Sequence, residues 1–380
     1  MEKLPINTIA QWIGADFHGE GEIDTFTNDS RAVTPGCLFV AMEGEVTDGH
    51  KYINQALAKG AAYAVAHKPG DYRPADRVLY VKNTREVLLS IASHYRDSFD
   101  LKVVGVTGSV GKTTTKEFIW TVLSAKYHTL KNLGNQNTEV GLPQTIFRLG
   151  RSHQAAVLEM GMCALGEIEE LTRVAKPDIG VITNVGVAHL EKLGSRENIF
   201  RAKCELLPHI RPGGLVVLNG DDPMLASLRG RTPVPAVFCG REEGLEYRAR
   251  RLEGDGDSRI LCQMTTPRMD RQVEIPALGE HMIYPALIAA AIGERFGLTQ
   301  DQIVEGILRF VPTRMRMNIL YRGDGIVILD DTYNANPQSM RAAISVLSDR
   351  RSQWSIAVLG DMFELGPFAP ALHTGVGECL

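Results

Sequence analysis

One segment, a strand followed by a glycine-rich turn and a helix, constrains the fold of this chain more than any other. The apolar run Val103–Val106 leads into Gly105-Val-Thr-Gly-Ser-Val-Gly-Lys-Thr-Thr114, and a helical pattern follows over Thr113–Leu123. Backbone N–H groups of such a turn and the positive end of the helix dipole converge on one point, where they can surround phosphate oxygens. The segment therefore predicts a nucleotide-binding α/β domain. The alternative is a strand–helix turn that binds nothing.

The residues of this turn have distinct expected roles. Lys112 can reach the outer phosphates of a nucleotide, and the Thr113 hydroxyl can hold Mg²⁺. We call residues 108–114 the phosphate loop. The residues expected to contact the nucleotide are Gly108, Ser109, Val110, Gly111, Lys112, Thr113 and Thr114.

The alternation of strand and helix continues beyond the phosphate loop. Short apolar runs have the character of buried parallel strands, and helical patterns such as Ile199–Ile210 follow them. This pattern is typical of a doubly wound sheet, in which ligands bind at the carboxyl ends of the strands. Residues 248–276 indicate antiparallel strands, and residues 284–296 indicate a helix. The parallel strands are expected at residues 103–106, 155–160, 179–183 and 215–218.

Two further blocks flank this central region. Residues 1–98 read as a small α/β unit, with strands at 38–42, 62–67 and 78–81 and helices at 52–59 and 85–95. The region from residue 313, which we call the C-terminal block, predicts two buried strands at 326–329 and 356–359 and a helix at 339–347. A sheet of two strands cannot bury both of its faces, so this block is expected to be incomplete. The chain as given is therefore expected to bind its substrates but to ligate them poorly. We therefore expect three domains, at residues 1–98, 99–312 and 313–380, the last of them partial.

Composition narrows the class of protein. The net charge of −4 gives no basic surface for nucleic acid, and no apolar run reaches the roughly 18 residues of a membrane helix. The six cysteines are scattered, without the spacing of a zinc site or of a disulfide framework. The N-terminus lacks a signal-peptide pattern. We expect a cytoplasmic protein that binds neither nucleic acid nor membrane, with a monomer as the default state.

Seven stretches, in the same order along the chain, resemble motifs of the Mur ligase family. The last two, Asp330-Asp-Thr-Tyr-Asn-Ala-Asn-Pro337 and Gly360-Asp-Met-Phe-Glu-Leu-Gly366, resemble the branch of the family that adds D-alanyl-D-alanine. Met282 and Pro285 depart from the family pattern, which usually has Asn at both positions. The seven stretches are Thr107–Glu117, Gly134–Pro143, Leu158–Gly161, Thr183–Glu191, Arg201–Glu205, Ile328–Pro337 and Gly360–Gly366.

The resemblance implies a fold and a reaction. The fold is the three-domain α/β architecture of Mur ligases, with a central doubly wound P-loop ATPase domain. The reaction is the ATP- and Mg²⁺-dependent ligation of D-alanyl-D-alanine to UDP-N-acetylmuramoyl-tripeptide, through an acyl phosphate, in peptidoglycan precursor synthesis. Such a reaction brings anions together, so the site needs cations more than a nucleophile. The alternatives are another Mur-type amino-acid ligase and a non-catalytic nucleotide-binding fragment.

Metal ligands are expected at the ends of the central strands. Glu159 and His189 follow predicted buried strands, and a carboxylate with an imidazole suits Mg²⁺ with retained waters. Lys203 shares one helical stripe with Ile199, Leu206 and Ile210, so its amine is expected to be buried and therefore paired, neutralised or modified, with desolvation favouring the neutral form. The alternative is a lysine that extends from the helix edge to solvent. The resemblance implies that this lysine is carbamylated and helps to bind a second Mg²⁺. The expected metal set is Thr113, Glu159, His189 and Lys203.

The remaining site residues follow from the resemblance. Arg314 or Arg316 is expected to reach the γ-phosphate. The expected catalytic set is Lys112, His189, Lys203 and Arg314. For the four residues expected to hold the incoming amine, which lie between Asp331 and Asn336, the alternative is an ordinary turn, because Asn and Pro favour turns. The expected substrate contacts are Ser30, Arg31, Asp48, Gly49 and His50 for the UDP moiety, Asn135 and Asn137 in the Asn-rich loop, and Asp331, Tyr333, Asn334 and Asn336 for the incoming amine.

Overall fold

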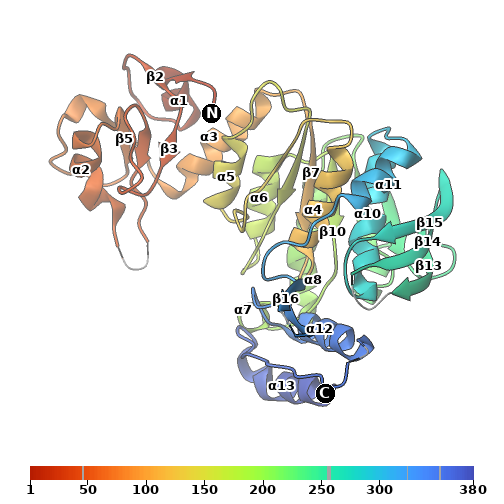
Figure 1. The fold of residues 1–380 in the computed structure, drawn as a ribbon. Coiled ribbons are helices and arrows are strands. Elements are labelled where there is room, and N and C mark those ends of the chain that lie inside the picture. The colour runs from red at the N-terminus through yellow and green to blue at the C-terminus, as the bar shows by residue number, and fades with distance from the viewer. Residues whose placement is uncertain (45–46, 255–257, 323, 351) are drawn as a thin grey trace. The chain divides into compact units, whose positions relative to one another are not determined.

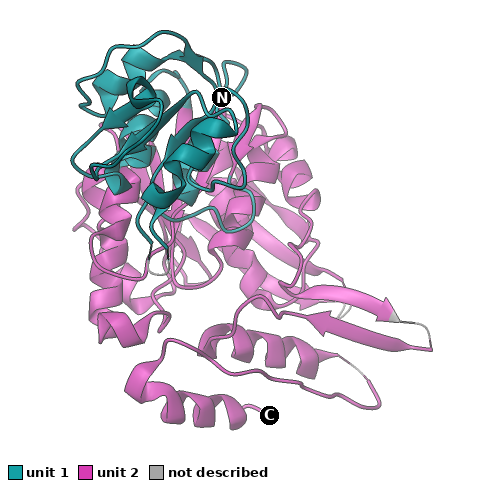
Figure 2. Cartoon of the chain, turned by 90° about the vertical axis from the view of Figure 1, so that its left-hand side faces the viewer, with its two compact units in different colours: residues 1–101, 132–153, 173–175 teal, residues 102–131, 154–172, 176–380 magenta. Residues whose placement is uncertain are grey.

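The computed structural model describes residues 1–44, 47–254, 258–322, 324–350 and 352–380. The chain forms two compact units (Figure 2). The first unit comprises residues 1–101, 132–153 and 173–175, and the second comprises residues 102–131, 154–172 and 176–380. Both units are mixed α/β, which confirms the predicted class. The boundaries expected near residues 98 and 312 stay predictions.

The first unit contains a four-stranded parallel sheet in the order β3-β4-β5-β6. Its core lies between the sheet and the helix α2, where Phe39, Ile53 and Ala64 are fully buried. The strands and helices predicted in this region all form. Its elements are β1 (Leu4–Pro5), α1 (Ile6–Trp12), β2 (Glu22–Ile23), β3 (Phe26–Thr27), β4 (Leu38–Val40), α2 (Ile53–Ala58), β5 (Tyr63–Ala66), β6 (Val78–Tyr80), α3 (Arg85–Asp97) and α5 (Gly141–Ile146).

The second unit is built on a nine-stranded sheet in the order β15-β14-β13-β12-β11-β10-β7-β9-β8 (Figure 1). Strands β7 to β13 pair in parallel, whereas β13, β14 and β15 are antiparallel, as residues 248–276 predicted. The strands are β7 (Lys102–Thr107), β8 (Thr129–Lys131), β9 (Ala155–Glu159), β10 (Ile179–Ile182), β11 (Leu215–Asn219), β12 (Ala236–Gly240), β13 (Tyr247–Gly254), β14 (Ile260–Thr266) and β15 (Met269–Ile275).

One face of this sheet carries the main core. Helix α4 (Lys112–Leu123) packs against α10 (Ile283–Arg295) and α11 (Gln300–Leu308), and the Phe118 and Phe310 rings stack with centroids 3.8 Å apart. Nearly every residue of α10 is buried, and its packing against α4 holds in place the helix that begins at the phosphate loop. The other helices of this part are α6 (Glu167–Ala175), α7 (Leu190–Leu193), α8 (Arg196–Cys204) and α9 (Pro223–Ala226).

Helix α8 is shorter than predicted. It ends at Cys204, and a 3₁₀ turn follows over Leu207–His209. Pro208 explains the break, because it has no N–H to donate to the Cys204 carbonyl and its ring would clash with that carbonyl in a continued α-helix. The predicted inward stripe nevertheless forms, since Ile199, Lys203, Leu206 and Ile210 are all buried.

The C-terminal block differs from the prediction. Strands β16 (Asn318–Arg322) and β17 (Ile326–Asp330) form an antiparallel pair, accompanied by α12 (Pro337–Asp349) and α13 (Ala369–Gly377). The strand predicted at residues 356–359 does not form: Ile356 is 79% exposed and Val358 is 92% exposed. No strand of the described residues lies beside this segment, so its backbone lacks the partners that a sheet requires. Ile326 and Ile328 are also exposed, so β17 is not the buried strand that we expected.

None of the described helices combines the length and apolarity needed to cross a lipid bilayer.

Candidate functional site

The phosphate loop connects β7, in the middle of the parallel part of the sheet, to the first turn of α4. Gly108 and Gly111 have φ angles of +150° and +79°, a region that residues with a β-carbon rarely adopt. Gly111 precedes α4 without any side-chain cap, so the first N–H groups of that helix have no partner within it. Lys112 Nζ folds back and donates to the Gly108 carbonyl at 2.9 Å. The loop thus places helix N–H groups and one ammonium together, as phosphate binding requires.

The residues that follow β10 hold the phosphate loop in shape. Asn184 Oδ1 accepts from the Val110 N–H at 3.0 Å, and the Asn184 carbonyl accepts from the Ser109 N–H at 3.1 Å. The Thr183 hydroxyl donates to the Val110 carbonyl at 2.6 Å, and a β-carbon on Gly108 would lie 1.8 Å from that hydroxyl oxygen. The N–H groups of Ser109 and Val110 are therefore engaged by Asn184. Phosphate contacts fall instead to the first turn of α4 and to Lys112.

Lys112 lies in a buried and electrostatically mixed environment. Desolvation lowers the pKa of its ammonium, the Glu159 carboxylate opposes this shift, and the Arg316 guanidinium adds to it. These influences locate a carboxylate and a second cation close to the phosphate loop. Arg316 and Glu159 are separated by more than 150 positions in the sequence, so the fold brings them together.

Glu159 occupies the position that the sequence predicts, at the carboxyl end of β9. It pairs in register with Val106 of β7 and is 2% exposed. Lys116 Nζ lies 3.6 Å from its carboxylate and 3.3 Å from that of Glu117. The carboxylate is therefore charge-balanced within the protein.

His189 lies after β10 in a left-handed conformation, with φ of +62°, and precedes α7. Its Nδ1 lies against the Glu364 carboxylate of the C-terminal block. Burial lowers the pKa of the imidazole, Glu364 opposes this shift, and Lys112 and Lys203 add to it. Ligand atoms of Cys163, His189 and Glu364 all lie within 4.8 Å of one another, and within the described chain this is the one set of His, Cys, Asp or Glu found at metal-ligand spacing. Glu159 is not a member of that set.

Lys203 is 1% exposed, as its helical stripe predicts. Desolvation lowers the pKa of its ammonium well below the ordinary value, and the charge of Lys112 lowers it further. Burial therefore shifts the equilibrium toward the neutral amine, which is the form that reacts with CO₂. Whether the amine is carbamylated stays a prediction.

The expected Mg²⁺ donors fit that ion in chemical type. Thr113 and Glu159 are buried beside the phosphate loop, and His189 follows the neighbouring strand β10. Thr107 Oγ1, at the end of β7, is buried and has no hydrogen-bond partner among the described residues. A hydroxyl, a carboxylate and an imidazole are donors that can serve Mg²⁺ when it keeps several waters.

The residues expected to hold the incoming amine follow β17. The Asp331 carboxylate accepts from the Met317 N–H at 3.0 Å, and burial raises the pKa of Asp331 to about 6. Asn336 caps α12 by accepting from the N–H groups of Gln338 and Ser339. This is the structural role that the sequence offered as the alternative to a substrate contact. Asn334 is exposed, and its side-chain oxygen accepts from the neighbouring Ala335 N–H at 2.9 Å.

The two candidate arginines differ in their surroundings. Arg316 lies over the Tyr333 ring, with its guanidinium carbon 4.1 Å from the ring centroid, and its charge acts on Lys112. Arg314 is exposed. The geometry therefore favours Arg316 as the arginine that serves the phosphate loop.

The first turn of α12 contacts the segment after β10 that supports the phosphate loop. A β-carbon on Gly186 would lie 2.0 Å from Gln338 Oε1, and the Gly186 N–H donates to the Ser109 hydroxyl at 2.9 Å. Only glycine allows Gln338 to approach this closely. Sequence reasoning missed Asn184 and Gly186, although both lie in the Thr183–Glu191 motif.

In the first unit, Asp48 organises the loop expected to hold UDP, of which Glu45 and Val46 lie outside the described residues. Lys68 lies 2.8 Å from the Asp48 carboxylate, and both Lys68 and His50 lower the pKa of Asp48. His50 Nδ1 contacts Asp48 at 2.6 Å, while Nε2 accepts from the His67 N–H at 3.1 Å. Both ring nitrogens are thus engaged, so His50 supports the loop. Gly49 is needed, because a β-carbon there would lie 2.7 Å from the Met42 carbonyl oxygen.

The other expected substrate residues of the first unit are more open. Arg31 pairs with Asp29 at 2.8 Å and its side chain is 89% exposed, and the Ser30 carbonyl accepts from Lys59. Asn135 is exposed, and its carbonyl accepts from the Asn137 N–H at 2.7 Å. Arg31 and Asn135 present side chains to solvent, as ligand contacts require.

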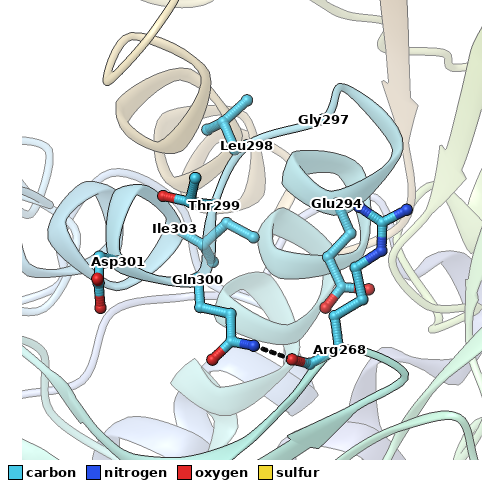
Figure 3. Close-up of a pocket in the computed structure, with 8 residues that line it drawn as sticks. All are labelled: Arg268, Glu294, Gly297, Leu298, Thr299, Gln300, Asp301 and Ile303. Atoms are coloured by element: carbon cyan, nitrogen blue, oxygen red, sulfur yellow. Dashed lines mark hydrogen bonds between the residues drawn. The ribbon is translucent and has the colours of Figure 1, made fainter.

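A separate cavity of about 500 Å³ lies where α10 ends and α11 begins (Figure 3). Glu294 is buried in its wall and accepts from Tyr247 and Thr266, and the Gln300 amide donates to the Arg268 carbonyl. The neighbouring Gly297 carbonyl accepts from Lys126, just beyond the C-terminal end of α4. The length of α4, roughly 18 Å, separates this cavity from the phosphate loop, so the cavity is not part of the phosphate site.

Comparison with known proteins agrees with this geometry. Family models match in sequence order: the Mur ligase family catalytic domain at residues 22–96, the Mur ligase middle domain at 106–293, and the Mur ligase glutamate ligase domain at 315–380. The UDP-N-acetylmuramoyl-tripeptide–D-alanyl-D-alanine ligase of Bacillus subtilis is 35% identical, over 100% of this chain and 83% of its own length. The enzyme of that name from Escherichia coli is 33% identical, over 94% and 78%.

Solved structures give the same result. A crystal structure of MurF from Acinetobacter baumannii matches with a TM-score of 0.94 at 32% identity, over 99% of this chain and 83% of that one. MurF from Thermotoga maritima in complex with ADP matches with a TM-score of 0.86 at 31% identity, over 94% and 82%. The predicted three-domain architecture is thereby confirmed. A phosphate loop braced by the next strand, together with relatives of this identity along nearly the whole chain, establishes that the protein belongs to the Mur ligase family.

Proposed function

We propose that this chain uses ATP to join D-alanyl-D-alanine to UDP-N-acetylmuramoyl-tripeptide, as the names of its relatives state for those proteins. The observation that carries the proposal is the meeting of two motifs within the second unit. The segment after β17 places Tyr333 against Arg316, and the Arg316 charge acts on Lys112 of the phosphate loop. The segment expected to receive the amine and the loop expected to hold ATP therefore serve one site.

The first step is attack by the substrate carboxylate on the γ-phosphate, which forms the acyl phosphate and leaves ADP. Both reactants are anions, so their approach requires fixed positive charge. Lys112 and the first turn of α4 bind the phosphates, and Arg316 supplies a second cation. We place Arg316, rather than Arg314, in this role.

The second step is attack by the amine of D-alanyl-D-alanine on the acyl phosphate, which releases phosphate from a tetrahedral intermediate. Asp331 accepts a hydrogen bond from the backbone and lies in a partly desolvated position after β17. Its carboxylate is suited to hold the ammonium of the incoming dipeptide before that amine loses its proton. Tyr333 is exposed beside it, where a substrate can reach the ring.

Thr113, Glu159 and His189 would hold Mg²⁺, which neutralises phosphate charge when bound. A carbamate on Lys203 would add an anionic oxygen ligand for a second ion. The chain's own contribution is to keep this amine neutral by burial. We also propose domain boundaries near residues 98 and 312, and a cytoplasmic location.

Phosphate release tests the function directly. The chain is incubated with ATP, Mg²⁺ and UDP-N-acetylmuramoyl-tripeptide, and each of D-alanyl-D-alanine, D-alanine and L-glutamate is offered as the amine. The proposal expects sustained phosphate release and a UDP-pentapeptide product only with D-alanyl-D-alanine. Release with L-glutamate instead would identify another Mur-type ligase, and ATP binding without release under any condition would identify a non-catalytic protein.

A further inference from the structure

The three ligand atoms gathered around His189 form a donor set that differs from the one expected for Mg²⁺. Cys163 lies between β9 and α6, His189 follows β10, and Glu364 comes from the C-terminal block. The atoms lie within 4.8 Å of one another, although the residues are up to 201 positions apart. Nothing in the sequence spacing suggested that this cysteine would meet a histidine.

Backbone contacts hold each side chain in place. The Cys163 N–H donates to the Glu167 carboxylate at 2.6 Å, in the first turn of α6. The Glu364 carbonyl accepts from the Glu191 N–H at 3.0 Å, beside His189. A β-carbon on Gly366 would lie 3.2 Å from the Glu191 Cα, so the turn that carries Glu364 packs closely on α7. The cluster is therefore built by the fold and does not depend on surface side chains alone.

The His189 ring nitrogen is directed at the carboxylate of this cluster. Its Nδ1 is buried and lies against the Glu364 carboxylate, which comes from a segment 175 positions further along the chain. An imidazole nitrogen and a carboxylate directed toward the same point, with a thiol beside them, form the arrangement that a shared cation would complete.

We propose that Cys163, His189 and Glu364 bind a thiophilic divalent cation, Zn²⁺, with water as the fourth ligand. Sulfur, nitrogen and oxygen donors suit Zn²⁺, whereas a thiolate is a poor ligand for Mg²⁺. Ligands of a tetrahedral zinc ion lie about 3.3–3.8 Å apart. The widest separations in the cluster must therefore shorten by about 1 Å, and the His189 and Glu364 atoms, which are in contact, must move apart; side-chain rotation supplies both changes. Binding displaces the Cys163 thiol proton to solvent, breaks the contact between His189 Nδ1 and the Glu364 carboxylate, and leaves the proton of the neutral imidazole on Nε2 so that Nδ1 can coordinate.

Bound zinc would have a mechanical and a chemical consequence. It would fasten residues 361–366 of the C-terminal block to the ends of β9 and β10. It would also occupy the His189 imidazole, which the proposed function assigns to Mg²⁺. Zinc is therefore expected to inhibit turnover, and this consequence, unlike the zinc site itself, rests on the proposed function.

Cobalt titration tests the site without any substrate. Co²⁺ is added to the chelator-stripped full chain, and the thiolate-to-cobalt charge-transfer absorption is recorded. We expect one equivalent to bind, and an equal amount of Zn²⁺ to abolish the band. Cys163→Ser should remove the band, whereas Cys379→Ser, which changes an exposed cysteine elsewhere, should keep it. Glu364→Gln should weaken Co²⁺ binding at least tenfold.

Each outcome decides the proposal. A band that survives Cys163→Ser, disappears in Cys379→Ser or never forms overturns the site. Unchanged affinity in Glu364→Gln removes the carboxylate from it, and the three-ligand proposal fails. Thermal melting of the metal-free variants controls for misfolding, and the exposed Glu364 side chain provides a test if Cys163→Ser does not fold. Because the readout is spectroscopic, its failure is distinct from failure of the ligase assay.

Discussion

Asn184 is bonded to Val110 twice, by accepting from its N–H at 3.0 Å and by donating to its carbonyl at 2.9 Å. This side chain, at the exit of β10, therefore fixes the middle of the phosphate loop in the manner of a paired strand. Its role is to position the loop, since its polar atoms are engaged with backbone and not directed at a ligand.

The first prediction concerns this pair. Asn184→Ala removes two hydrogen bonds worth about 2 kcal/mol together, so the loop loses its preformed shape and ATP affinity should fall about 30-fold. Calorimetric titration with an ATP analogue measures the change. The matched control is Asn54→Ala, because Asn54 also bonds backbone twice, to Asp71 and Arg73 in the first unit. Equal ATP affinity in the two variants would contradict the positioning role.

The second prediction separates the two arginines. Arg316→Ala should lower turnover at least 100-fold, because a cation that stabilises phosphoryl-transfer charge contributes on that scale or above. Arg314→Ala should remain within about threefold of the parent, since an exposed arginine without such contacts contributes little. Steady-state phosphate release measures both. A larger loss from Arg314→Ala would reverse the assignment.

The third prediction concerns Lys203. Lys203→Met keeps the volume of the side chain and removes the amine, so turnover should fall at least 100-fold while ATP affinity stays within about threefold. A short-chain carboxylate added to Lys203→Ala should recover part of the rate, because it can replace a carbamate. Full activity of Lys203→Arg would show that the side chain has only a structural role.

Lys203 also predicts a pH dependence of stability. Its pKa is lowered in the folded protein, so the unfolded chain binds one proton more between the folded pKa and about 10.4. The free energy of unfolding should therefore rise with pH in this window through this group. Denaturant unfolding from pH 7 to 9.5 should show a steeper rise in the parent than in Lys203→Met. Parallel curves would mean that the buried amine is charged.

The fourth prediction concerns Asp331, whose shift has the opposite sign. Its pKa of about 6 means that the folded state holds a proton that the unfolded state releases near pH 4. Stability through this group should fall as pH rises from 4 to 6 and stay level above. For a partly screened carboxyl the loss is about 1–2 kcal/mol. Asp331→Asn should abolish this slope in denaturant unfolding, and an unchanged slope would contradict the raised pKa.

The sequence predicted most of what local pattern determines. The strand before the phosphate loop, the helix after it and the inward face of Lys203 all depend on residues within one or two turns of one another. The end of α8 at Cys204 was predictable from Pro208. The apolar stripe that continues to Ile210 led instead to the prediction of a longer helix. The segment at 356–359 has strand character, yet a strand needs a neighbour, and local sequence does not reveal whether one is present.

The missed site residues share a different cause. Cys163, Glu364 and Asn184 have no local signal, because each acquires its role from a residue far along the chain. The choice between Arg314 and Arg316 stayed open in the sequence for the same reason, since their surroundings, including the Tyr333 ring beside Arg316, come from the fold. Family motifs identified the stretches that matter without indicating which atoms would meet.

The contact of Gln338 with Gly186 has a thermodynamic consequence. Gly186 holds Ser109 through a backbone bond, so the start of α12 and the phosphate loop press on one peptide from two sides. If bound nucleotide stabilises one arrangement of that peptide, it changes by the same free energy the stability of the α12 position that goes with this arrangement, because linkage is reciprocal. If nucleotide in the loop and the dipeptide at the segment proposed to hold it favour the same arrangement of this peptide, each raises the affinity for the other by the same factor, and the loop acts as a sensor as well as a binding site.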